Sequence, residues 1–266
     1  MRIAPAFVKS KANMNDDVVE VVLHARTPDG DAEGFLYQPD AKGPWPGVLF
    51  YTDIGGIRQA PQDQARRLAS EGYSVLVPNL FYRTSSLPVF TFKINLGDER
   101  TTRRFAELSA PLTPEAMDRD AAAYVDFLAA CPDVAKRPMG VVGYCYSGTM
   151  AMRTAAVRPD KIEALASFHA GRLLVDGPAS PHLLLPKIKA RLYFGHAVQD
   201  RSMPEEAIKK FEEALRTWGG KYESETYESA FHSWTMSDSP VYNQLQAERA
   251  FGKLTELLSE ILKTGS

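Results

Sequence analysis

The chain has 266 residues, of which 44% are hydrophobic, enough to fill a core and too much for a disordered chain or a disulfide-held miniprotein. It carries 31 Lys and Arg residues against 33 Asp and Glu residues, a formal net charge of -2, so no global positive field would recruit nucleic acid or an anionic membrane. Two cysteines are too few for a disulfide framework and suit a reducing compartment.

The sequence pattern predicts neither a signal peptide nor a membrane-spanning segment. A signal peptide needs an apolar run of about seven residues, and Lys9 and Lys11 interrupt the first candidate. No stretch reaches the roughly 18 apolar residues of a membrane span. We therefore expect a cytoplasmic protein with no nucleic-acid or membrane partner, either a monomer or a small homo-oligomer.

Short apolar runs rich in Val, Leu, Tyr and Phe predict strands along the chain. Pro28, Asp29 and Gly30 lie between the first two runs and favour a tight turn, so the sheet should begin with an antiparallel hairpin. The runs cover residues 19–25, 33–38, 47–52, 73–78, 139–144, 164–169, 190–195 and 222–228.

Helical patterns alternate with the later strands. The clearest covers 114–130, where apolar residues recur every three to four positions. Such alternation predicts an α/β fold: a central, mostly parallel sheet of eight strands with an N-terminal antiparallel hairpin and helices on both faces. Chemistry should then lie at the carboxyl ends of the strands. The other helices are expected near 60–71, 147–158, 204–217 and 242–263.

We expect one domain over residues 1–266, with 1–18 as an N-terminal extension. Residues 84–113 are too long for an ordinary connection and mix apolar with charged residues. They form either a surface excursion with a helical turn or a lid-like flap over the site.

The most informative run is MGVVGYCYSG at 139–148, a strand that leads into a helix with the form GxCxS. A nucleophile on a sharp strand-to-helix turn needs small residues two positions before and after it, and Gly143 and Ser147 meet that need around Cys145. The following helix would offer unpaired amides and favour an anion. The alternative is an ordinary buried cysteine, which is how we interpret Cys131, with no disulfide between the two.

A thiol nucleophile needs a base, and the base needs an orienting acceptor. Asp200 follows the strand at 190–195, and His232 follows the strand at 222–228. The order Cys145, Asp200, His232 is the nucleophile, acid, base order of the α/β-hydrolase fold.

Each partner has alternatives. His169 and His196 also stand at strand ends, His24 lies on the hairpin, and His182 lies in a polar loop. Asp200 could instead cap the helix that starts near Pro204.

These residues resemble the dienelactone hydrolase family, which carries a GYC turn matched here by Gly143, Tyr144 and Cys145. The resemblance spans roughly residues 20–262, includes the Asp200 loop and His232, and implies an α/β-hydrolase fold with a Cys-Asp-His triad.

The resemblance also implies an oxyanion hole made by the amides of Ile54 and Tyr146. A family glutamate that accepts the thiol proton is matched by the shorter Asp53, which could serve as a local base or only satisfy loop amides.

Of two family arginines that bind a substrate carboxylate, one matches Arg83 and the other falls near Met236. One cation orients a carboxylate less well than two, so the substrate either lacks the acid or binds it through Arg103 or Arg104.

Aromatic side chains near the motifs suggest an apolar pocket, although such residues are more often core. The candidates for substrate contact are Tyr82, Tyr144 and Trp234, with Phe81, Tyr146 and Phe231 beside them.

Together these patterns predict a hydrolase that cleaves a small ester or lactone through a thioester on Cys145 and requires no metal or organic cofactor. A ligand-binding protein on the same scaffold is the main alternative. A redox sensor built on Cys145 is another.

Overall fold

The computed structural model describes residues 8–10 and 17–264. Its backbone contacts divide the chain into two compact units, residues 1–136 and residues 137–266. The predicted extension over 1–18 falls mainly outside the described residues. Within it, β1 (Val8–Ser10) pairs with the next strand, and the sequence did not predict it.

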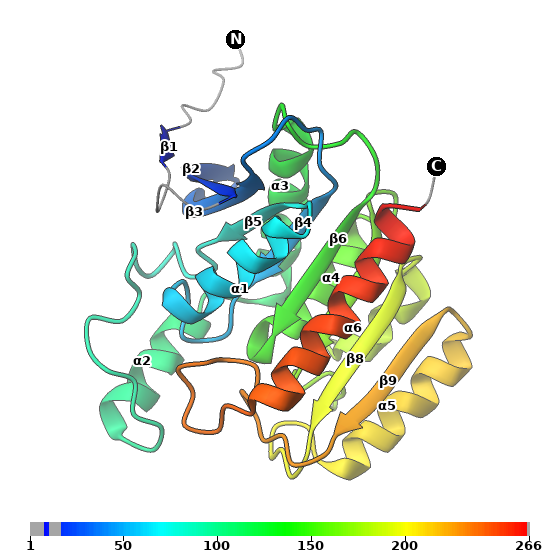
Figure 1. The fold of residues 1–266 in the computed structure, drawn as a ribbon. Helices are drawn as coiled ribbons and strands as arrows, with labels where there is room; N and C mark the ends of the chain where they lie inside the picture. The colour runs from blue at the N-terminus through cyan, green and yellow to red at the C-terminus, as the bar shows by residue number, and fades with distance from the viewer. Residues whose placement is uncertain (1–7, 11–16, 265–266) are drawn as a thin grey trace. The chain divides into compact units, whose positions relative to one another are not determined.

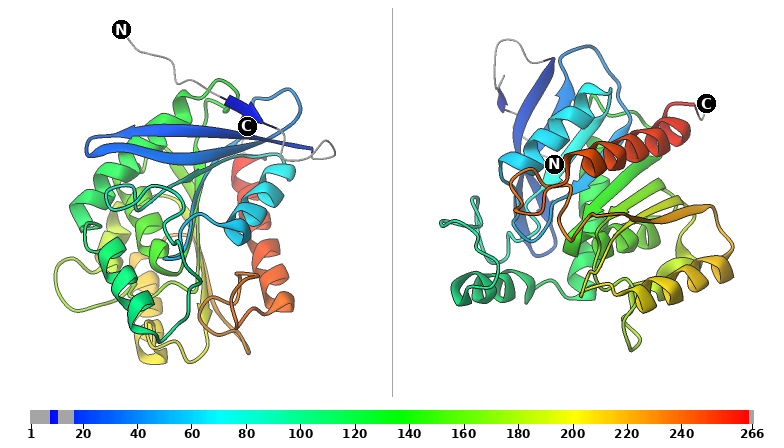
Figure 2. Two further views of the ribbon diagram at one scale, coloured as in Figure 1. Left: turned by 90° about the vertical axis from the view of Figure 1, so that its left-hand side faces the viewer. Right: turned by 60° about the horizontal axis from the view of Figure 1, so that its bottom comes forward.

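The first unit has an antiparallel and a parallel part. β2 and β3 form the predicted hairpin, seen in Figure 2 as a long blue ribbon. β3 is antiparallel to β5, whereas β4 and β5 are parallel. Helices α1 and α3 cover opposite faces of these strands (Figure 1). The elements are β2 (Val18–Thr27), β3 (Gly30–Pro39), β4 (Gly47–Tyr51), α1 (Gln59–Ser70), β5 (Ser74–Pro78), α2 (Glu99–Ser109) and α3 (Pro114–Ala130).

Local side-chain bonds explain why the hairpin turns where it does. The Thr27 hydroxyl donates to the Gly30 carbonyl at 2.9 Å and accepts from the Asp29 amide at 3.1 Å. Gly30 has φ 141°, a region that side chains with a β-carbon avoid. The turn therefore ends β2 and starts β3 with a fixed register.

Helix α3 starts and stops as its sequence predicts. Thr113 caps its first turn by accepting from the Ala116 amide at 3.2 Å, and Pro114 occupies the first position. Cys131 follows the helix and is buried, which raises the pKa of its thiol to about 11. Cys131 is a free thiol, as is Cys145.

The excursion over 84–113 contains more structure than one helical turn. α2 lies in its second half, capped by Asp98, whose carboxylate accepts from the Thr101 amide at 2.6 Å. A hydrogen bond holds the start of the excursion against β3, because the Leu87 amide donates to the Glu33 carboxylate at 2.8 Å. Asp98 followed by acidic Glu99 is the helix-start signal that the sequence carried.

The second unit is a parallel sheet in the order β6, β7, β8, β9. Helices α4 and α5 lie on one face and α6 on the other (Figures 1 and 2). All four strands end at the same edge. The elements are β6 (Met139–Tyr144), η1 (Cys145–Ser147), α4 (Gly148–Val157), β7 (Ile162–Phe168), η2 (Pro181–Lys187), β8 (Arg191–Ala197), α5 (Glu205–Trp218), β9 (Tyr222–Tyr227) and α6 (Gln244–Leu262).

The eight predicted strands correspond to β2 through β9. β4, β5 and β6 are buried along their whole length, as their continuous apolar runs require. Across residues 8–10 and 17–264, no helix is both long and apolar enough to cross a bilayer.

Candidate active site

Cys145 stands at the turn between β6 and α4. The turn is one short 3-10 segment, and Cys145 has φ 56°, a left-handed value that costs energy for a residue with a β-carbon. The side chain is half-buried. A strained residue at a strand end with an accessible side chain is typical of a functional position.

Small residues are needed on both sides of this turn. A β-carbon added to Gly143 would lie 2.4 Å from the Ser147 carbonyl oxygen, and one added to Gly148 would lie 2.4 Å from the Ser167 hydroxyl and the Ala170 methyl. The Ser147 hydroxyl also closes the turn by accepting from the amide that precedes Cys145, at 2.9 Å. The strand and the helix therefore approach as closely as the GxCxS pattern predicts.

The structure brings together the three residues predicted as nucleophile, acid and base. The Nε2 atom of His232 lies 3.0 Å from the Sγ of Cys145, and its Nδ1 lies 2.6 Å from Oδ2 of Asp200. Cys145 follows β6, Asp200 follows β8 and His232 follows β9. Parallel strands explain the meeting, because their carboxyl ends share one edge of the sheet.

Asp200 is anchored by a residue that the sequence analysis did not single out. Its Oδ1 accepts from the Ser202 amide at 2.8 Å and from the Ser202 hydroxyl at 2.6 Å. Burial alone would raise the pKa of Asp200, but the hydrogen bonds from His232 and Ser202 outweigh it and bring the pKa below its usual value. The capping alternative is wrong, because α5 has no side-chain cap. An Asp followed two residues later by Ser is a turn signal that could have found Ser202.

The charge of His232 follows from its two partners. Burial alone would lower the pKa of His232, but the hydrogen bonds to Asp200 and Cys145 raise it to about 10. The raised pKa makes Nε2 of His232 a strong acceptor for a proton from Sγ, which lies 3.0 Å away. The arrangement therefore suits nucleophilic attack by Sγ with proton transfer through Nε2.

Three of the other four histidines have different hydrogen-bond partners. Nε2 of His169 pairs with the Thr235 hydroxyl at 2.7 Å, and Nδ1 of His182 pairs with Ser180 at 2.6 Å. His196 is buried next to Ser224, at 3.2 Å, and His24 lies on β2. Within the described residues, His232 is the histidine that bonds to Cys145.

Burial of His196 should make the protein sensitive to acid. Burial lowers the pKa of His196 from 6.5 to about 4 even though Asp200 acts in the opposite direction. Between these two values the unfolded chain binds a proton that the folded chain does not. The free energy of unfolding should therefore fall with falling pH, by up to about 1.4 kcal/mol per pH unit.

The stabilising contribution of His196 is complete above pH 6.5 and is lost as the pH falls through about 4. Urea unfolding of the wild type and of a His196→Asn variant across this window measures the effect. The variant should show the shallower decline, and parallel declines would contradict the assignment.

In the first unit, the loop after β4 carries Asp53 and Ile54. Both Asp53 oxygens pair with Arg58, at 2.6 and 2.9 Å, and Oδ1 also accepts from the Gly55 amide at 2.8 Å. These contacts match the alternative in which the Asp53 carboxylate binds an amide of its own loop. The structure adds an ion pair between Asp53 and Arg58. Ile54 is half-buried in the same loop.

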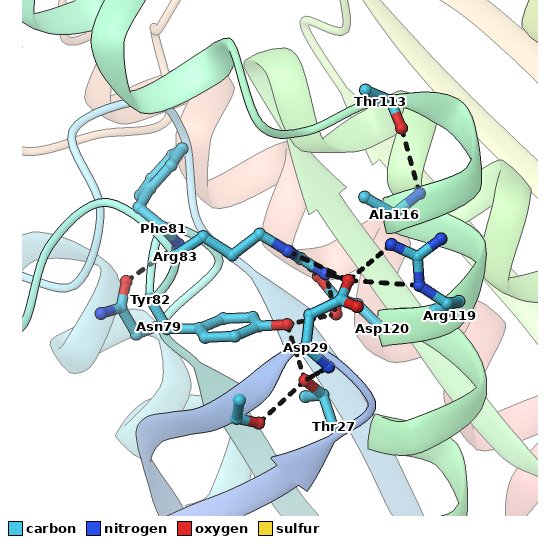
Figure 3. A network of polar contacts seen from close by, with 11 residues as sticks. Thr27, Asp29, Asn79, Phe81, Tyr82, Arg83, Thr113, Ala116, Arg119 and Asp120 are labelled. Atoms are coloured by element: carbon cyan, nitrogen blue, oxygen red, sulfur yellow. Dashed lines mark hydrogen bonds and ion pairs between the residues drawn. The ribbon is translucent and has the colours of Figure 1, made fainter.

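Arg83 belongs to a polar network rather than presenting a free cation (Figure 3). Its guanidinium donates to both oxygens of Asp120, at 2.7 and 2.8 Å, and to Asp29 at 2.5 Å. Tyr82 donates to the same Asp120 at 2.8 Å. Arg83 and Tyr82, which the sequence predicted as substrate contacts, both donate to Asp120. Asp120 is 0% exposed, and a buried carboxylate requires such partners.

The sequence contained a signal for this network. Asp120 lies on the apolar stripe of α3, three residues after Met117 and four before Tyr124, where a charge is out of place unless it is paired. The alternative arginines are also occupied, since Arg103 pairs with Glu99 and Arg104 donates to the carbonyl of residue 89.

The aromatic residues predicted to contact substrate lie in the core. Tyr144 is 4% exposed and stacks on Phe168, with ring centroids 5.6 Å apart, while Trp234 is 0% exposed and stacks on Tyr227 at 5.0 Å. Both rings also contact the buried His169 ring, at 6.0 and 5.0 Å. Met236 is also fully buried. Phe231, directly before His232, is the exposed aromatic, at 45%.

Known proteins match this chain over most of its length. Residues 32–262 match the model described as "Dienelactone hydrolase family". The carboxymethylenebutenolidase of Rhodococcus opacus is 26% identical over 210 residues, which cover 79% of this chain and 78% of that protein.

Two solved structures extend the comparison. A Klebsiella pneumoniae protein provisionally named a dienelactone hydrolase has a TM-score of 0.81 at 19% identity, covering 91% of this chain and 99% of its own. A dienelactone hydrolase from Anabaena variabilis has a TM-score of 0.68 at 18% identity, covering 92% and 99%. The family match includes the positions of Cys145, Asp200 and His232.

Proposed function

Because the chain belongs to the dienelactone hydrolase family and has the α/β-hydrolase fold of its structural neighbours, we propose that it hydrolyses a small ester or lactone through a thioester on Cys145. The observation that supports this most directly is His232, whose two ring nitrogens lie 3.0 Å from Sγ and 2.6 Å from the Asp200 carboxylate. A nucleophile, a base and an orienting acid in one hydrogen-bonded row are what acyl transfer requires.

In the first half of the proposed reaction, Sγ attacks the ester carbonyl carbon, and His232 holds the thiol proton on Nε2. The negative charge that develops on the carbonyl oxygen needs backbone donors. We assign that task to the amide of Tyr146 and, by resemblance to the family, to that of Ile54. Collapse of the tetrahedral intermediate breaks the carbon–oxygen bond, and the leaving oxygen takes the proton from Nε2.

In the second half, His232 removes a proton from water, which attacks the thioester carbonyl. The carbon–sulfur bond breaks, the carboxylic acid leaves, and the sulfur recovers its proton or its ion pair with His232. Asp200 keeps Nδ1 protonated throughout, so that Nε2 can exchange the proton. No step in this scheme requires a metal or an organic cofactor.

For substrate class, we propose a neutral ester or lactone. The position that resembles a family carboxylate-binding arginine is Arg83, whose guanidinium is paired with Asp29 and Asp120. The other position, Met236, is apolar and buried. Matched neutral and carboxylate-bearing lactones should therefore differ in kcat/KM in favour of the neutral one. A preference for the acidic lactone would contradict this and point to another cation, such as the exposed Arg172.

The test of the function itself is hydrolysis of p-nitrophenyl acetate before and after iodoacetamide treatment. Steady turnover that iodoacetamide removes supports the hydrolase. A single stoichiometric release of nitrophenolate, or none, supports a ligand-binding protein on the same scaffold. Turnover that survives complete alkylation of Cys145 would overturn the thioester mechanism.

Ser202 should affect kcat through its hydrogen bonds to Asp200. A Ser202→Ala variant loses the 2.6 Å hydroxyl donor and keeps the 2.8 Å amide donor, so kcat should fall about tenfold with KM little changed, as expected for one hydrogen bond to a charged group. Ser180→Ala is the matched control, because it removes a hydroxyl that pairs with His182 instead. Equal activities of the two variants would contradict this role.

A further inference from the structure

His169 lies at the centre of the side chains that surround the triad without belonging to it. Its ring meets His232 edge to face, with centroids 5.3 Å apart and an angle of 62°, and meets Trp234 in the same way at 5.0 Å and 72°. The side chain is 0% exposed. It therefore contacts the proposed base but is closed off from any substrate.

The backbone and the ring of His169 are both held. Its amide donates to the Gly195 carbonyl at 2.7 Å, and its φ of 40° turns the chain sharply at the end of β7. Its Nε2 pairs with the Thr235 hydroxyl at 2.7 Å, three residues beyond His232. His169 thus connects the central strands to the loop that carries the base.

The same ring also contacts the strand that leads to the nucleophile. It lies 6.0 Å from the ring of Tyr144, at an angle of 46°, and Tyr144 directly precedes Cys145. One buried imidazole therefore packs against both the nucleophile strand and the base, which are far apart in the sequence. A displacement of about 1 Å between such groups can cost a hundredfold in rate.

The charge state of His169 suits this position. Burial first, and the nearby His232 second, lower the pKa of His169 well below its usual value, while Asp200 acts in the opposite direction. The titratable groups that face it are His232, Asp200 and Tyr144. A neutral His169 ring can pack against a protonated His232 ring, whereas a second cation at that position would oppose protonation of His232.

We propose that His169 is a positioning residue for the hydrolysis: through its hydrogen bond to Thr235 and its edge contact with His232, it keeps the base in line between Cys145 and Asp200. The inference rests on the proposed function, because it concerns the same site. It assigns His169 no contact with substrate and no proton transfer of its own.

Three variants test the proposal. His169→Phe keeps a ring and removes the bond to Thr235, Thr235→Val removes the hydroxyl alone, and Thr235→Ser restores it. His169→Phe and Thr235→Val should each lower kcat by about ten- to a hundredfold, with KM changed by less than about twofold. Thr235→Ser should stay near the wild type, and the double variant should be no worse than the poorer single one.

A second readout does not depend on turnover. NMR titration of the His232 ring should show its pKa falling from about 10 in the wild type toward the ordinary imidazole value in His169→Phe and Thr235→Val. A folded His169→Phe protein with unchanged kcat and unchanged His232 titration would overturn the proposal, as would equal losses in Thr235→Ser and Thr235→Val. If His169→Phe does not fold, the Thr235 pair decides the question.

The two proposals can fail separately. If the wild type shows no thiol-dependent hydrolysis, the proposed function fails. The NMR titration then still determines whether His169 and Thr235 position His232.

Discussion

Replacing Cys145 by alanine is expected to lower kcat/KM for p-nitrophenyl acetate by at least about 10⁴-fold, because the atom that forms the acyl intermediate is gone. The fold should persist, since the thiol is half-buried and alanine has the same backbone demands at φ 56°. Steady-state kinetics and urea unfolding measure the two effects independently. Wild-type turnover in this variant would eliminate Cys145 as the nucleophile.

Two further variants sharpen this result. Cys131→Ala removes the other free thiol and should leave both hydrolysis and its sensitivity to iodoacetamide intact. Cys145→Ser should leave little activity, because a serine hydroxyl is far less acidic than a thiol and His232 would have to remove a much more tightly held proton. Strong hydrolysis by the serine variant would mean that the site does not depend on thiol chemistry.

Replacing Arg83 by methionine should reduce the free energy of unfolding by about 3–5 kcal/mol at neutral pH, the usual effect of leaving a buried charge without its partner. Asp120 is fully buried and both of its oxygens accept from Arg83. Tyr82 alone would remain as its donor. Urea unfolding at pH 7 measures the loss.

The pH dependence and a double variant identify the cause. Burial, its largest influence, raises the pKa of Asp120 above its usual value even with Arg83 present. Without Arg83, protonation of Asp120 should relieve the penalty, so the deficit should shrink as the pH falls toward 4 and grow as the pH rises. Adding Asp120→Leu should restore much of the stability.

Arg119→Ala is the control for this network. Arg119 also donates to Asp29, but its side chain is 45% exposed, and exposed ion pairs contribute little. Its loss should be clearly smaller than that of Arg83→Met. Comparable losses in the two variants would show that Asp120 is not the reason for the effect.

Much of the fold was predictable because it depends on local patterns. Buried parallel strands require continuous apolar runs, and such runs located β4, β5 and β6. Two local signals, a proline after Thr113 and an apolar stripe, located α3. α2 was missed as a helix because its stripe carries many charges, and its capping residue Asp98 was the only strong local sign.

The sequence by itself determined the candidate triad. The spacing of Gly143, Cys145 and Ser147 is a local steric requirement, since a β-carbon at Gly143 would collide with the Ser147 carbonyl. The placement of Asp200 and His232 follows from strand order, because parallel strands deliver their carboxyl ends to one edge. Both rules concern residues near a strand end, and the position of such residues in space follows from their place in the sequence.

Only the tertiary structure decided which side chains become partners. Arg83 meets Asp29 and Asp120, which are 54 and 37 residues away along the chain, and no local pattern specifies such a pair. Burial is equally non-local: Trp234, two residues after His232, is core, whereas Phe231, directly before His232, is exposed. Charge pairing and burial depend on what other segments place around a residue, so they are settled when the chain packs.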